Sequence, residues 1–181
     1  MGAGTVDCDK LGHRTYEINT NAYKKIVEQF GSDILNRETL EIDRKKLGEK
    51  VFQKPDELKQ LTDIVWPEIR KLLNLEIEKL FREGKRIIVV EAALLLDANW
   101  DSGMNEVWVC FVPDDEAITR SVKRDNSNLE KVKSILNSQM SNVDRLKRAN
   151  VVFSSLWERE YTIKQVNKAW KLLQERINEK L

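Results

Sequence analysis

Two short apolar runs that each lead into a carboxylate constrain the fold of this chain more than any other feature. The first covers residues 3–8 and is followed by Asp9, and the second covers residues 86–91 and ends in Glu91. A continuous apolar run such as residues 87–90 is typical of a strand buried on both faces of a parallel sheet. Because the carboxyl ends of parallel strands meet at one edge of a sheet, we expect both acids at that edge.

Helical periodicity fills most of the remaining sequence. Further strands are expected at 106–112, stopped by Pro113, and at 151–153. Helices are predicted at 20–30, 43–52, from Pro55 up to a break or kink at Pro67, 68–82, 114–124, 129–140 and 159–178. Strands that alternate with helices indicate an α/β protein with a parallel sheet. The exception is 20–82, where about four helices follow one another and form a helical insertion between two strands.

The composition favours one helix-rich domain and excludes several classes of protein. With 181 residues, 41% of them hydrophobic and 34% charged, the chain can bury a substantial core as a single domain. The formal net charge of +1 gives no argument for a nucleic acid or membrane partner. No apolar stretch approaches the ~20 residues of a membrane span. Two cysteines and one histidine do not make a typical zinc site, and we expect a reducing compartment, cytoplasmic or mitochondrial.

Positive charge is concentrated in one part of the chain. Residues 120–150 hold eight basic and three acidic side chains, a local balance of +5. A solvated helix face is the plain interpretation, and a surface for an anionic ligand is the alternative. The sequence leaves both open.

Carboxylates at strand ends are also how P-loop phosphotransferases place their catalytic base and their magnesium-side acid. Yet the phosphate-binding sequence G-x-x-x-x-G-K-[ST] occurs nowhere in the 181 residues, and the seven glycines are too scattered to form it. The chain has the pattern of a small-molecule kinase that starts just after its phosphate-binding loop.

Several ordered motifs resemble those of the dephospho-coenzyme A kinase family, and together they span nearly the whole chain. They are Val6–Arg14 (VDCDKLGHR), Phe30–Leu35 (FGSDIL), Ile42–Gly48 (IDRKKLG) with Val51-Phe52, Leu61–Pro67 (LTDIVWP), Glu91–Ala98 (EAALLLDA) and Ser138–Ser141 (SQMS). Three segments are similar to the kinase domain of the animal bifunctional coenzyme A synthase, namely Trp66-Pro67, 155–158 (SLWE) and 165–170 (QVNKAW).

The resemblance implies a kinase that transfers the γ-phosphate of ATP to the 3′-hydroxyl of dephospho-CoA, the last step of coenzyme A biosynthesis. The implied fold is P-loop kinase-like, a three-layer αβα parallel sheet within a single domain at 1–181. Residues 20–82 would be the helical CoA-binding insertion, and residues 114–140 would be the lid. The first strand and the P-loop of the family would be absent, a loss of roughly 25–30 residues, or one β-α unit.

The loss of that unit has predicted consequences. In the family the first strand lies in the middle of the sheet. The strands at 86–91 and 106–112 would therefore each expose a row of unpaired backbone groups, or pair directly with each other. The missing loop carries most of the binding to the β- and γ-phosphates. We expect residues 1–181 by themselves to bind ATP poorly and to be an inefficient kinase.

Two acids match the reaction centre of the family. Asp9 matches the second acid of its D-x-D motif, where a carboxylate would orient the substrate hydroxyl or take its proton. A helix N-cap is the alternative role for Asp9. Glu91 matches the acid that follows the third strand, where it would hold a water bound to Mg²⁺. An ordinary strand-end carboxylate is the alternative for Glu91.

Arginines supply the positive charge that the resemblance implies. Arg44 matches the arginine of the I-x-R motif in the insertion and would bind the substrate. Arg120 and Arg124 would bind ATP from the lid, and Arg145 would act as a catalytic residue that stabilises charge on the transferring phosphate. A solvated basic surface is the alternative role for all four.

Leu94 and Leu95 complete the predicted site. They would line a groove for the pantetheine arm of the substrate, and membership of the core is the alternative. Two positions depart from the family pattern, because Ile135 stands near the place of a basic residue and Asn150 stands in the place of an aspartate. The first departure weakens the case for the lid, and the second bears on the end of the last strand.

The predicted small-molecule partners are dephospho-CoA, ATP and Mg²⁺, with no nucleic acid and no membrane span. A fusion to, or association with, a phosphopantetheine adenylyltransferase domain is a further prediction. The alternative function is a non-catalytic, kinase-derived fragment that binds a CoA-type ligand or a partner protein. Another P-loop nucleoside or nucleotide kinase is disfavoured by the long helical insertion at 20–82.

Overall fold

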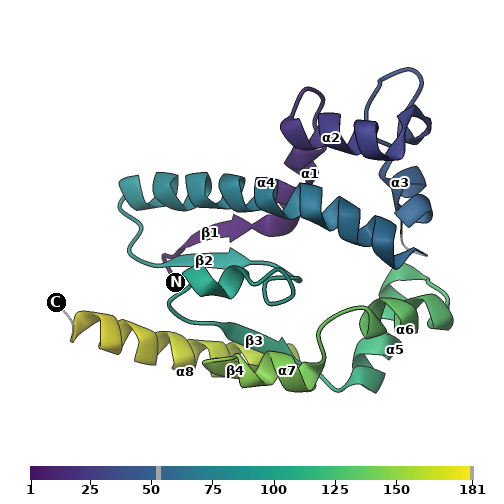
Figure 1. The fold of residues 1–181 in the computed structure, drawn as a ribbon. Helices are drawn as coiled ribbons and strands as arrows, with labels where there is room; N and C mark the ends of the chain where they lie inside the picture. The colour runs from purple at the N-terminus through teal and green to yellow at the C-terminus, as the bar shows by residue number, and fades with distance from the viewer. Residues whose placement is uncertain (52–53, 180–181) are drawn as a thin grey trace. The chain divides into compact units, whose positions relative to one another are not determined.

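The computed structural model describes residues 1–51 and 54–179, and the chain divides into two compact units, Met1–Ala93 and Leu94–Leu181 (Figure 1). Each unit has its own pair of parallel strands. Helices connect the two strands in each unit, as parallel strands require.

In the first unit, β1 (Gly4–Asp7) pairs with β2 (Ile88–Glu91). The register runs from Gly4 opposite Ile88 to Asp7 opposite Glu91. The strands predicted at 3–8 and 86–91 are therefore confirmed. Their last paired residues are both acidic, so two carboxylates stand at one edge of this strand pair.

Helix α1 (Cys8–Thr15) follows β1 without a loop. Asp7 is its N-cap, and its Oδ1 accepts a hydrogen bond from the backbone N–H of Lys10 at 3.1 Å. The sequence-based expectations include a helix here only through the alternative role of Asp9 as an N-cap, because the segment is short and its apolar residues show no clear period. An ion pair from Arg14 to Glu76, at 2.8 Å, ties α1 to the later helix α4.

Two predicted helices follow in the first unit. Helix α2 (Asn21–Phe30) begins after its N-cap Thr20 and ends at Gly31, whose φ of +84° is a conformation that favours glycine. A short 3₁₀ turn, η1 (Ser32–Ile34), leads towards α3 (Arg44–Val51). The helix predicted at 43–52 is found, although its expected end at residue 52 and the matched Phe52 lie outside the described residues.

Helix α4 (Pro55–Arg82) is continuous over 28 residues. Of the two alternatives predicted at Pro67, the break is wrong, because the helix runs through this proline, and the kink stays a prediction. Four buried residues at a spacing of four, Leu61, Val65, Ile69 and Leu73, carry its apolar stripe across the proline. The stripe packs against α1, α2, α3 and both strands of the unit, and this packing outweighs the hydrogen bond that proline removes (Figure 1).

In the second unit, β3 (Trp108–Phe111) pairs in parallel with β4 (Val151–Ser154), in agreement with the strands predicted at 106–112 and 151–153. The indole of Trp108 meets the ring of Phe153 edge to face at a centroid distance of 5.4 Å. Pro113 ends β3 and is the N-cap of the next helix, as its fixed φ allows.

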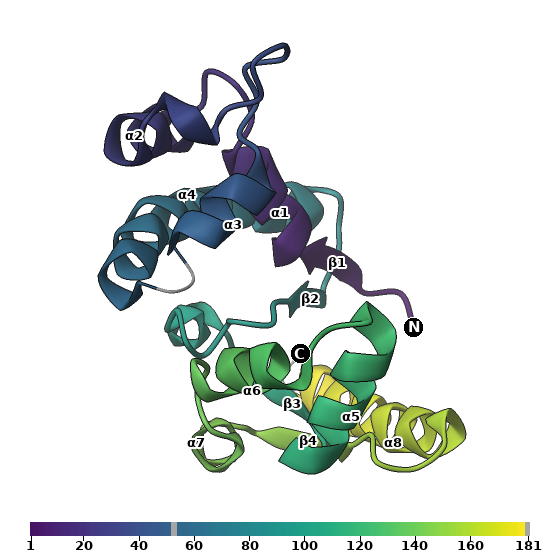
Figure 2. The ribbon, with the colours of Figure 1, turned by 90° about the vertical axis from the view of Figure 1, so that its right-hand side faces the viewer.

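Five helical segments complete the second unit (Figure 2). They are η2 (Trp100–Gly103), α5 (Asp114–Asp125), α6 (Leu129–Asn137), α7 (Asn142–Lys147) and α8 (Arg159–Asn178). Helices α5 and α6 pack on each other, α7 contacts β3, and α8 lies along β4. The helix predicted at 129–140 ends early, and α7 begins after a new cap, Ser141.

The described strands form two separate two-stranded sheets rather than one continuous sheet. Within its own unit β2 has one partner strand, β1, and β3 has one partner strand, β4. One edge of each of these strands is therefore free of strand pairing in its unit, as the sequence predicts for both. Free edges of this kind are sites where a further strand can add.

No helix in residues 1–51 and 54–179 combines the length and the apolar character that crossing a membrane requires.

Candidate active site

Carboxylates meet at the ends of β1 and β2 in the first unit. The register places Asp7 directly opposite Glu91. Both carboxylate oxygens of Asp7 have partners in the first turn of α1. Its Oδ1 caps the helix, and its Oδ2 lies 3.2 Å from the ammonium of Lys10. The hydrogen bond from the Lys10 backbone N–H, followed by that from its ammonium, lowers the pKa of Asp7. Asp7 is thus a structural carboxylate beside the predicted metal-side acid.

Asp9 lies one residue inside α1, in the first turn. The alternative role as N-cap is wrong for Asp9, because Asp7 takes that position. The Asp9 side chain is exposed and makes no hydrogen bond or ion pair with the described residues of its unit. Its carboxylate is free to contact a ligand, and the N–H groups of the helix terminus nearby favour a negative charge there.

Cys8 lies between Asp7 and Asp9 in the sequence, but its thiol is unreactive. Its thiol is buried, and burial, followed by the charges of Asp9 and Asp7, raises its pKa to about 11. A thiol with such a pKa is protonated at neutral pH and is a poor nucleophile or metal ligand. The chemistry at this edge therefore belongs to oxygen ligands.

Glu91 is exposed and its carboxylate has no hydrogen bond or ion pair with the described residues of its unit. Mg²⁺ keeps several waters and uses one or two protein carboxylates together with substrate phosphates. The adjacent carboxylates of Asp7 and Glu91 fit that donor set, with Glu91 the freer of the two. No group of three His, Cys, Asp or Glu side chains suited to a metal occurs within the described part of the chain.

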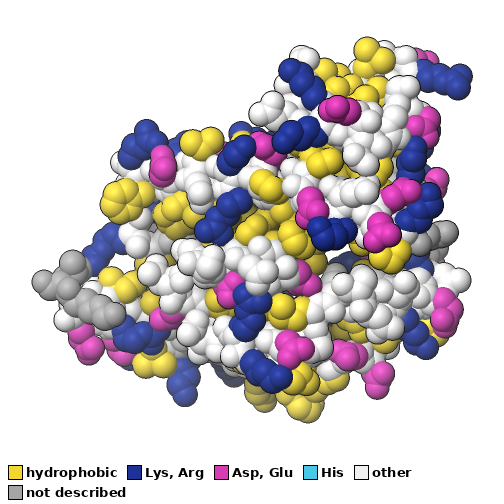
Figure 3. Space-filling model, in the orientation of Figure 1, with side chains coloured by type: hydrophobic (Ala, Val, Ile, Leu, Met, Phe, Trp, Pro, Cys, Tyr) yellow, Lys and Arg dark blue, Asp and Glu magenta, His cyan; other side chains and the backbone are white. Residues whose placement is uncertain are grey.

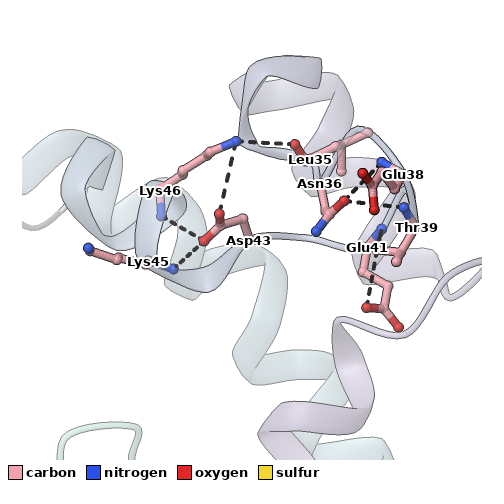
Figure 4. A network of polar contacts seen from close by, with 8 residues as sticks. All are labelled: Leu35, Asn36, Glu38, Thr39, Glu41, Asp43, Lys45 and Lys46. Carbon is pink, nitrogen blue, oxygen red and sulfur yellow. Dashed lines mark hydrogen bonds and ion pairs between the residues drawn. The ribbon is translucent and has the colours of Figure 1, made fainter.

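Arg44 is the first residue of α3. Its sequence neighbours Asp43, Lys45 and Lys46 form a polar network with the Leu35 carbonyl (Figure 4). Asp43 Oδ1 accepts hydrogen bonds from the backbone N–H groups of Lys45 at 3.0 Å and Lys46 at 3.2 Å. The Lys46 ammonium donates to the Leu35 carbonyl at 3.4 Å. These contacts fix the start of the helix and the position of Arg44.

The side chain of Arg44 takes no part in this network. It is exposed, and it makes no hydrogen bond or ion pair with the described residues of its unit. Burial raises the pKa of the Tyr16 phenol, and the charge of Arg44 partly offsets that increase, so the two side chains are neighbours. Arg44 is therefore an available cation on the insertion, as its predicted role requires.

Leu94 and Leu95 are both half-buried in a hydrogen-bonded turn that precedes η2. The Leu94 carbonyl accepts from the backbone N–H of Ala98, and the Leu95 carbonyl accepts from that of Trp100, each at 2.9 Å. Leu96, which follows them, is buried in the core. The two leucines keep accessible apolar surface, and their contact with substrate stays a prediction.

Arg120 and Arg124 both lie on α5 but differ in their contacts. Arg120 bonds to Glu116 at 2.6 Å and donates to the carbonyls of Ser155 at 2.8 Å and Leu156 at 3.2 Å. It holds the chain where β4 ends. Arg124 is largely exposed and forms a two-point ion pair with Asp125, both bonds at 2.7 Å, which lowers the pKa of Asp125.

Arg145, on α7, is the predicted arginine that lines a pocket. The pocket has a volume of about 180 Å³ and is lined by Asp114, Leu136, Asn137, Gln139, Met140, Ser141, Asn142 and Arg145. Arg145 Nη2 donates to Gln139 Oε1 at 3.1 Å and lies 3.8 Å from Asp97 Oδ2. Its guanidinium is held in place while most of its donors remain unbonded within the described part of this unit.

The basic stretch at 120–150 does not form a continuous positive surface. Six of its eight cations pair with nearby acids, in the ion pairs Arg120–Glu116, Arg124–Asp125, Lys133–Glu130, Arg145–Asp97, Lys147–Asp144 and Arg148–Asp101. On the face of the molecule in Figure 3, basic and acidic side chains are interspersed. This arrangement supports the solvated interpretation for most of the stretch and leaves the Arg145 pocket as the local exception.

Sequence reasoning gave no role to Asp97 and Gln139, the two partners of Arg145. Asp97 ends the apolar run that contains Leu94 and Leu95, in the same way that Glu91 ends β2. An acid in that position is a usable signal. No sequence pattern joins it to an arginine 48 residues further along the chain.

Two solved structures share this fold. The crystal structure of TT1252 from Thermus thermophilus gives a TM-score of 0.76 at 26% identity, covering 96% of this chain and 85% of that chain. A dephospho-CoA kinase from Campylobacter jejuni gives a TM-score of 0.67 at 26% identity, covering 99% and 88%. Parallel strands joined by helices, with acids at strand ends and arginines on later helices, are the features of an α/β phosphotransferase.

The family follows from sequence comparison. The dephospho-CoA kinase family model matches residues 1–156. A dephospho-CoA kinase of Bacillus licheniformis is 33% identical over 172 residues, which are 93% of this chain and 85% of the relative. One of Geobacillus kaustophilus is 32% identical over 177 residues, 96% and 88%. The chain belongs to the dephospho-CoA kinase family, and the predicted class of enzyme, a phosphotransferase of coenzyme A biosynthesis, is confirmed.

These relatives are bacterial kinases. The predicted likeness to the animal bifunctional synthase finds no support among them, so the recognition of the family is confirmed and its assignment to the animal branch is not. ATP use follows from the kinase family. A requirement for Mg²⁺ remains a prediction.

Proposed function

We propose that this protein transfers the γ-phosphate of ATP to the 3′-hydroxyl of dephospho-CoA. The family membership supports the reaction, and the observation that carries it to particular residues is the free, exposed carboxylate of Asp9 directly after the acidic end of β1. Relatives at about a third identity over most of the chain act, by name, on the same substrate.

Asp9 is the proposed catalytic base. The 3′-hydroxyl oxygen forms a bond to the γ-phosphorus while the bond from that phosphorus to the leaving oxygen of ADP breaks. Asp9 accepts the hydroxyl proton, so that charge and atoms balance. An exposed carboxylate in the first turn of a helix is able to reach a bound sugar. No described residue of the same unit competes with the substrate for the Asp9 carboxylate.

Glu91 is proposed to hold a water of the metal ion. Bound Mg²⁺ would neutralise negative charge on the β- and γ-phosphates. Glu91 suits this role because its carboxylate has no partner in its unit, whereas Asp7 beside it is already bonded to Lys10.

Arg145 is proposed to stabilise the charge on the transferring phosphate, with Arg120 and Arg124 binding ATP from the lid. The pocket and the unbonded donors support the first assignment. Arg120 would have to give up two backbone carbonyls in order to bind a phosphate. Arg124 would have to give up only its exposed pair with Asp125.

Arg44, Leu94 and Leu95 are proposed to bind dephospho-CoA. Arg44 offers an unpaired guanidinium that suits a phosphate of the substrate. The two leucines offer accessible apolar surface for the pantetheine arm. The segments 20–82 and 114–140 are proposed to act as the helical insertion and the lid of one domain with a three-layer αβα sheet.

The test is direct synthesis of coenzyme A. Residues 1–181 are mixed with ATP, Mg²⁺ and dephospho-CoA, and the product is followed by chromatography, with Asp9→Asn as the control. Because the 181 residues contain no P-loop sequence, we expect slow turnover from this polypeptide alone. Turnover that Asp9→Asn abolishes supports the proposal, and turnover that survives this change contradicts the role of Asp9.

A second function is considered because no G-x-x-x-x-G-K-[ST] sequence occurs within residues 1–181. A polypeptide that binds dephospho-CoA by calorimetry but shows no phosphoryl transfer would be a ligand-binding fragment. Nucleoside monophosphates offered as acceptors in the same assay test the third alternative, another nucleotide kinase.

Two finer proposals concern the setting of the enzyme. The first is an association with a phosphopantetheine adenylyltransferase domain, which co-purification with that domain tests. A cytoplasmic or mitochondrial location is proposed with it, and imaging of a tagged protein tests that location.

A further inference from the structure

Two aspartate–arginine pairs connect segment 94–103 to α7 in the second unit. Asp97 lies near Arg145, and Asp101 lies near Arg148. The two pairs have the same chemistry and join the same two parts of the chain. They differ in how completely each arginine is satisfied, which makes one pair a built-in control for the other.

The guanidinium of Arg148 donates hydrogen bonds from all three of its nitrogens. Its Nε and Nη2 bond to the two carboxylate oxygens of Asp101, the former at 3.1 Å. Its Nη1 donates to the Leu96 carbonyl at 3.0 Å, and Nη2 also donates to Asn99 Oδ1 at 3.2 Å. Every guanidinium nitrogen has an acceptor and four of the five N–H donors are bonded, so Arg148 is a structural clamp.

Arg145 is held but not saturated. Its hydrogen bond is the one from Nη2 to Gln139 Oε1, and the distance of 3.8 Å from Nη2 to Asp97 Oδ2 is too long for a second. Within the described part of the unit, its Nε and Nη1 have no acceptor. The side chain is 21% exposed and lines the pocket, so these donors remain for an anionic group there.

Asp97 controls both contacts of Arg145. Its Oδ1 accepts a hydrogen bond from the backbone N–H of Met140 at 2.8 Å, which fixes the loop that carries Gln139. Its Oδ2 is buried and has no hydrogen-bond donor within the described part of the chain, and the nearest cation is Arg145. A buried carboxylate oxygen without a donor is costly, so a structural purpose alone does not account for it.

We propose that Asp97 is the positioning residue of Arg145. The charge at Oδ2 orients the guanidinium, and the bond at Oδ1 holds Gln139 in reach, so that the free donors of Arg145 meet a phosphate-type anion in the pocket. This inference rests on the proposed function, which assigns Arg145 to the transferring phosphate. Asp97 itself does not touch the reacting atoms.

Three variants of the full chain test the proposal. Asp97→Asn keeps an oxygen acceptor for the Met140 N–H, so the loop is retained, but it removes the charge and places an amide near Arg145. Asp101→Asn is the matched control, since it weakens the Arg148 clamp and leaves the pocket untouched. Arg145→Lys removes the planar guanidinium and completes a double-variant cycle with Asp97→Asn.

Two readouts separate positioning from mere stability. Calorimetry with pyrophosphate measures anion binding, and ¹⁵N NMR of the arginine side chains measures how freely each guanidinium rotates. We expect Asp97→Asn to weaken pyrophosphate binding by about tenfold and to loosen the Arg145 signal, with little further loss when Arg145→Lys is added. Asp101→Asn should change pyrophosphate binding by less than about twofold and loosen only Arg148.

The outcomes that overturn the inference are specific. An Arg145 signal that Asp97→Asn leaves unchanged excludes positioning, whether or not pyrophosphate binds. If Asp97→Asn and Asp101→Asn lose pyrophosphate binding equally, both aspartate–arginine pairs act only by stabilising the fold, and the positioning role is wrong. If the wild-type chain binds no pyrophosphate, the Arg145 pocket is not an anion site and the proposal is overturned.

Failure of the proposed function gives a different result. If the wild-type chain makes no coenzyme A but Asp97→Asn still loosens Arg145 and weakens pyrophosphate binding, the positioning role stands and the kinase assignment falls. If coenzyme A is made and Asp97→Asn behaves like Asp101→Asn in kcat and KM, the kinase assignment stands and the positioning role falls.

Discussion

The first unit offers acids at the ends of its strands, whereas the second offers arginines on its helices. Asp9 and Glu91 are exposed and have no internal partners in their unit. In the second unit, Arg148 and Arg120 are bound to carbonyls and carboxylates, and Arg145 is held in a pocket. The acids are placed by the backbone alone, while the arginines are part of the packing.

This difference predicts how substitutions in the two units behave. An acid that contacts nothing is replaceable without loss of stability, so its loss reports on chemistry. An arginine that bridges elements contributes to folding, so its loss mixes folding with chemistry. Only Arg145, with donors to spare, is expected to fall between these two cases.

The largest effect is expected at Asp9. In Asp9→Asn the side chain keeps its shape but no longer accepts a proton, so kcat for coenzyme A formation should fall by about 10²–10⁴-fold. The melting temperature should stay unchanged because the carboxylate has no partner in its unit. Steady-state kinetics and thermal unfolding measure both quantities.

The matched control for that variant is Asp63→Asn. Asp63 is an exposed acid of α4 whose ion pair is with Lys59 on the same helix face. It should leave kcat unchanged. A clear loss of melting temperature in Asp9→Asn would show that this acid is structural, and the contrast between the units would be broken.

A smaller loss is expected at Arg145. Arg145→Lys keeps one positive charge but loses the fork of donors, so kcat should fall by about 10- to 10³-fold. The melting temperature should drop slightly because the bond to Gln139 is weakened. Arg176→Lys, at an exposed ion pair with Glu106 in the same unit, is the control for lost guanidinium chemistry. A kcat that both variants share with the wild type would contradict the assignment.

The sequence predicted the strands well because apolar runs and alternation are local signals. The short helix α7 was not predicted as a separate helix, and α1 was foreseen only as an alternative, since six to eight residues carry too little periodicity. The helix break predicted at Pro67 was wrong. Local propensity disfavours a helix at a proline, but the buried residues Val65 and Ile69 on either side keep α4 continuous there. Tertiary packing decided that case.

The candidate site shows the same limit. The places of Asp9 and Glu91 were predictable because each lies at or just after the end of a predicted strand, while their roles stay predictions. The pair of Asp97 with Arg145 was not, because long-range contacts leave no pattern in a single sequence. The family resemblance found Arg120 as well, but only the structure shows that it already holds the carbonyls of Ser155 and Leu156.

A moderate effect on stability alone is expected at the N-cap of α2. Thr20 Oγ1 accepts from the Tyr23 N–H at 3.1 Å and donates to the carbonyl of Thr15 at 2.7 Å. Thr20→Ala should lower the free energy of unfolding by about 1 kcal/mol, with kcat per folded molecule unchanged. Thr20→Ser restores the hydroxyl and should recover the loss. If urea unfolding gives the same curve for Thr20→Ala and the wild type, the first unit does not depend on its caps.

The smallest effect is a pH dependence in the second unit. Hydrogen bonds from Arg148, and then its charge, lower the pKa of Asp101 in the folded protein. A group with a lowered folded pKa stabilises the protein above its unfolded pKa, near 4, and this contribution is lost as the pH falls through the folded pKa. The wild type should therefore lose more stability than Asp101→Asn between about pH 5 and pH 2, and the difference should stay within about 1 kcal/mol for a partly exposed pair. Urea unfolding midpoints at a series of pH values measure this difference. Parallel curves of stability against pH for the wild type and Asp101→Asn would mean that the charge of Asp101 contributes nothing to the free energy of unfolding.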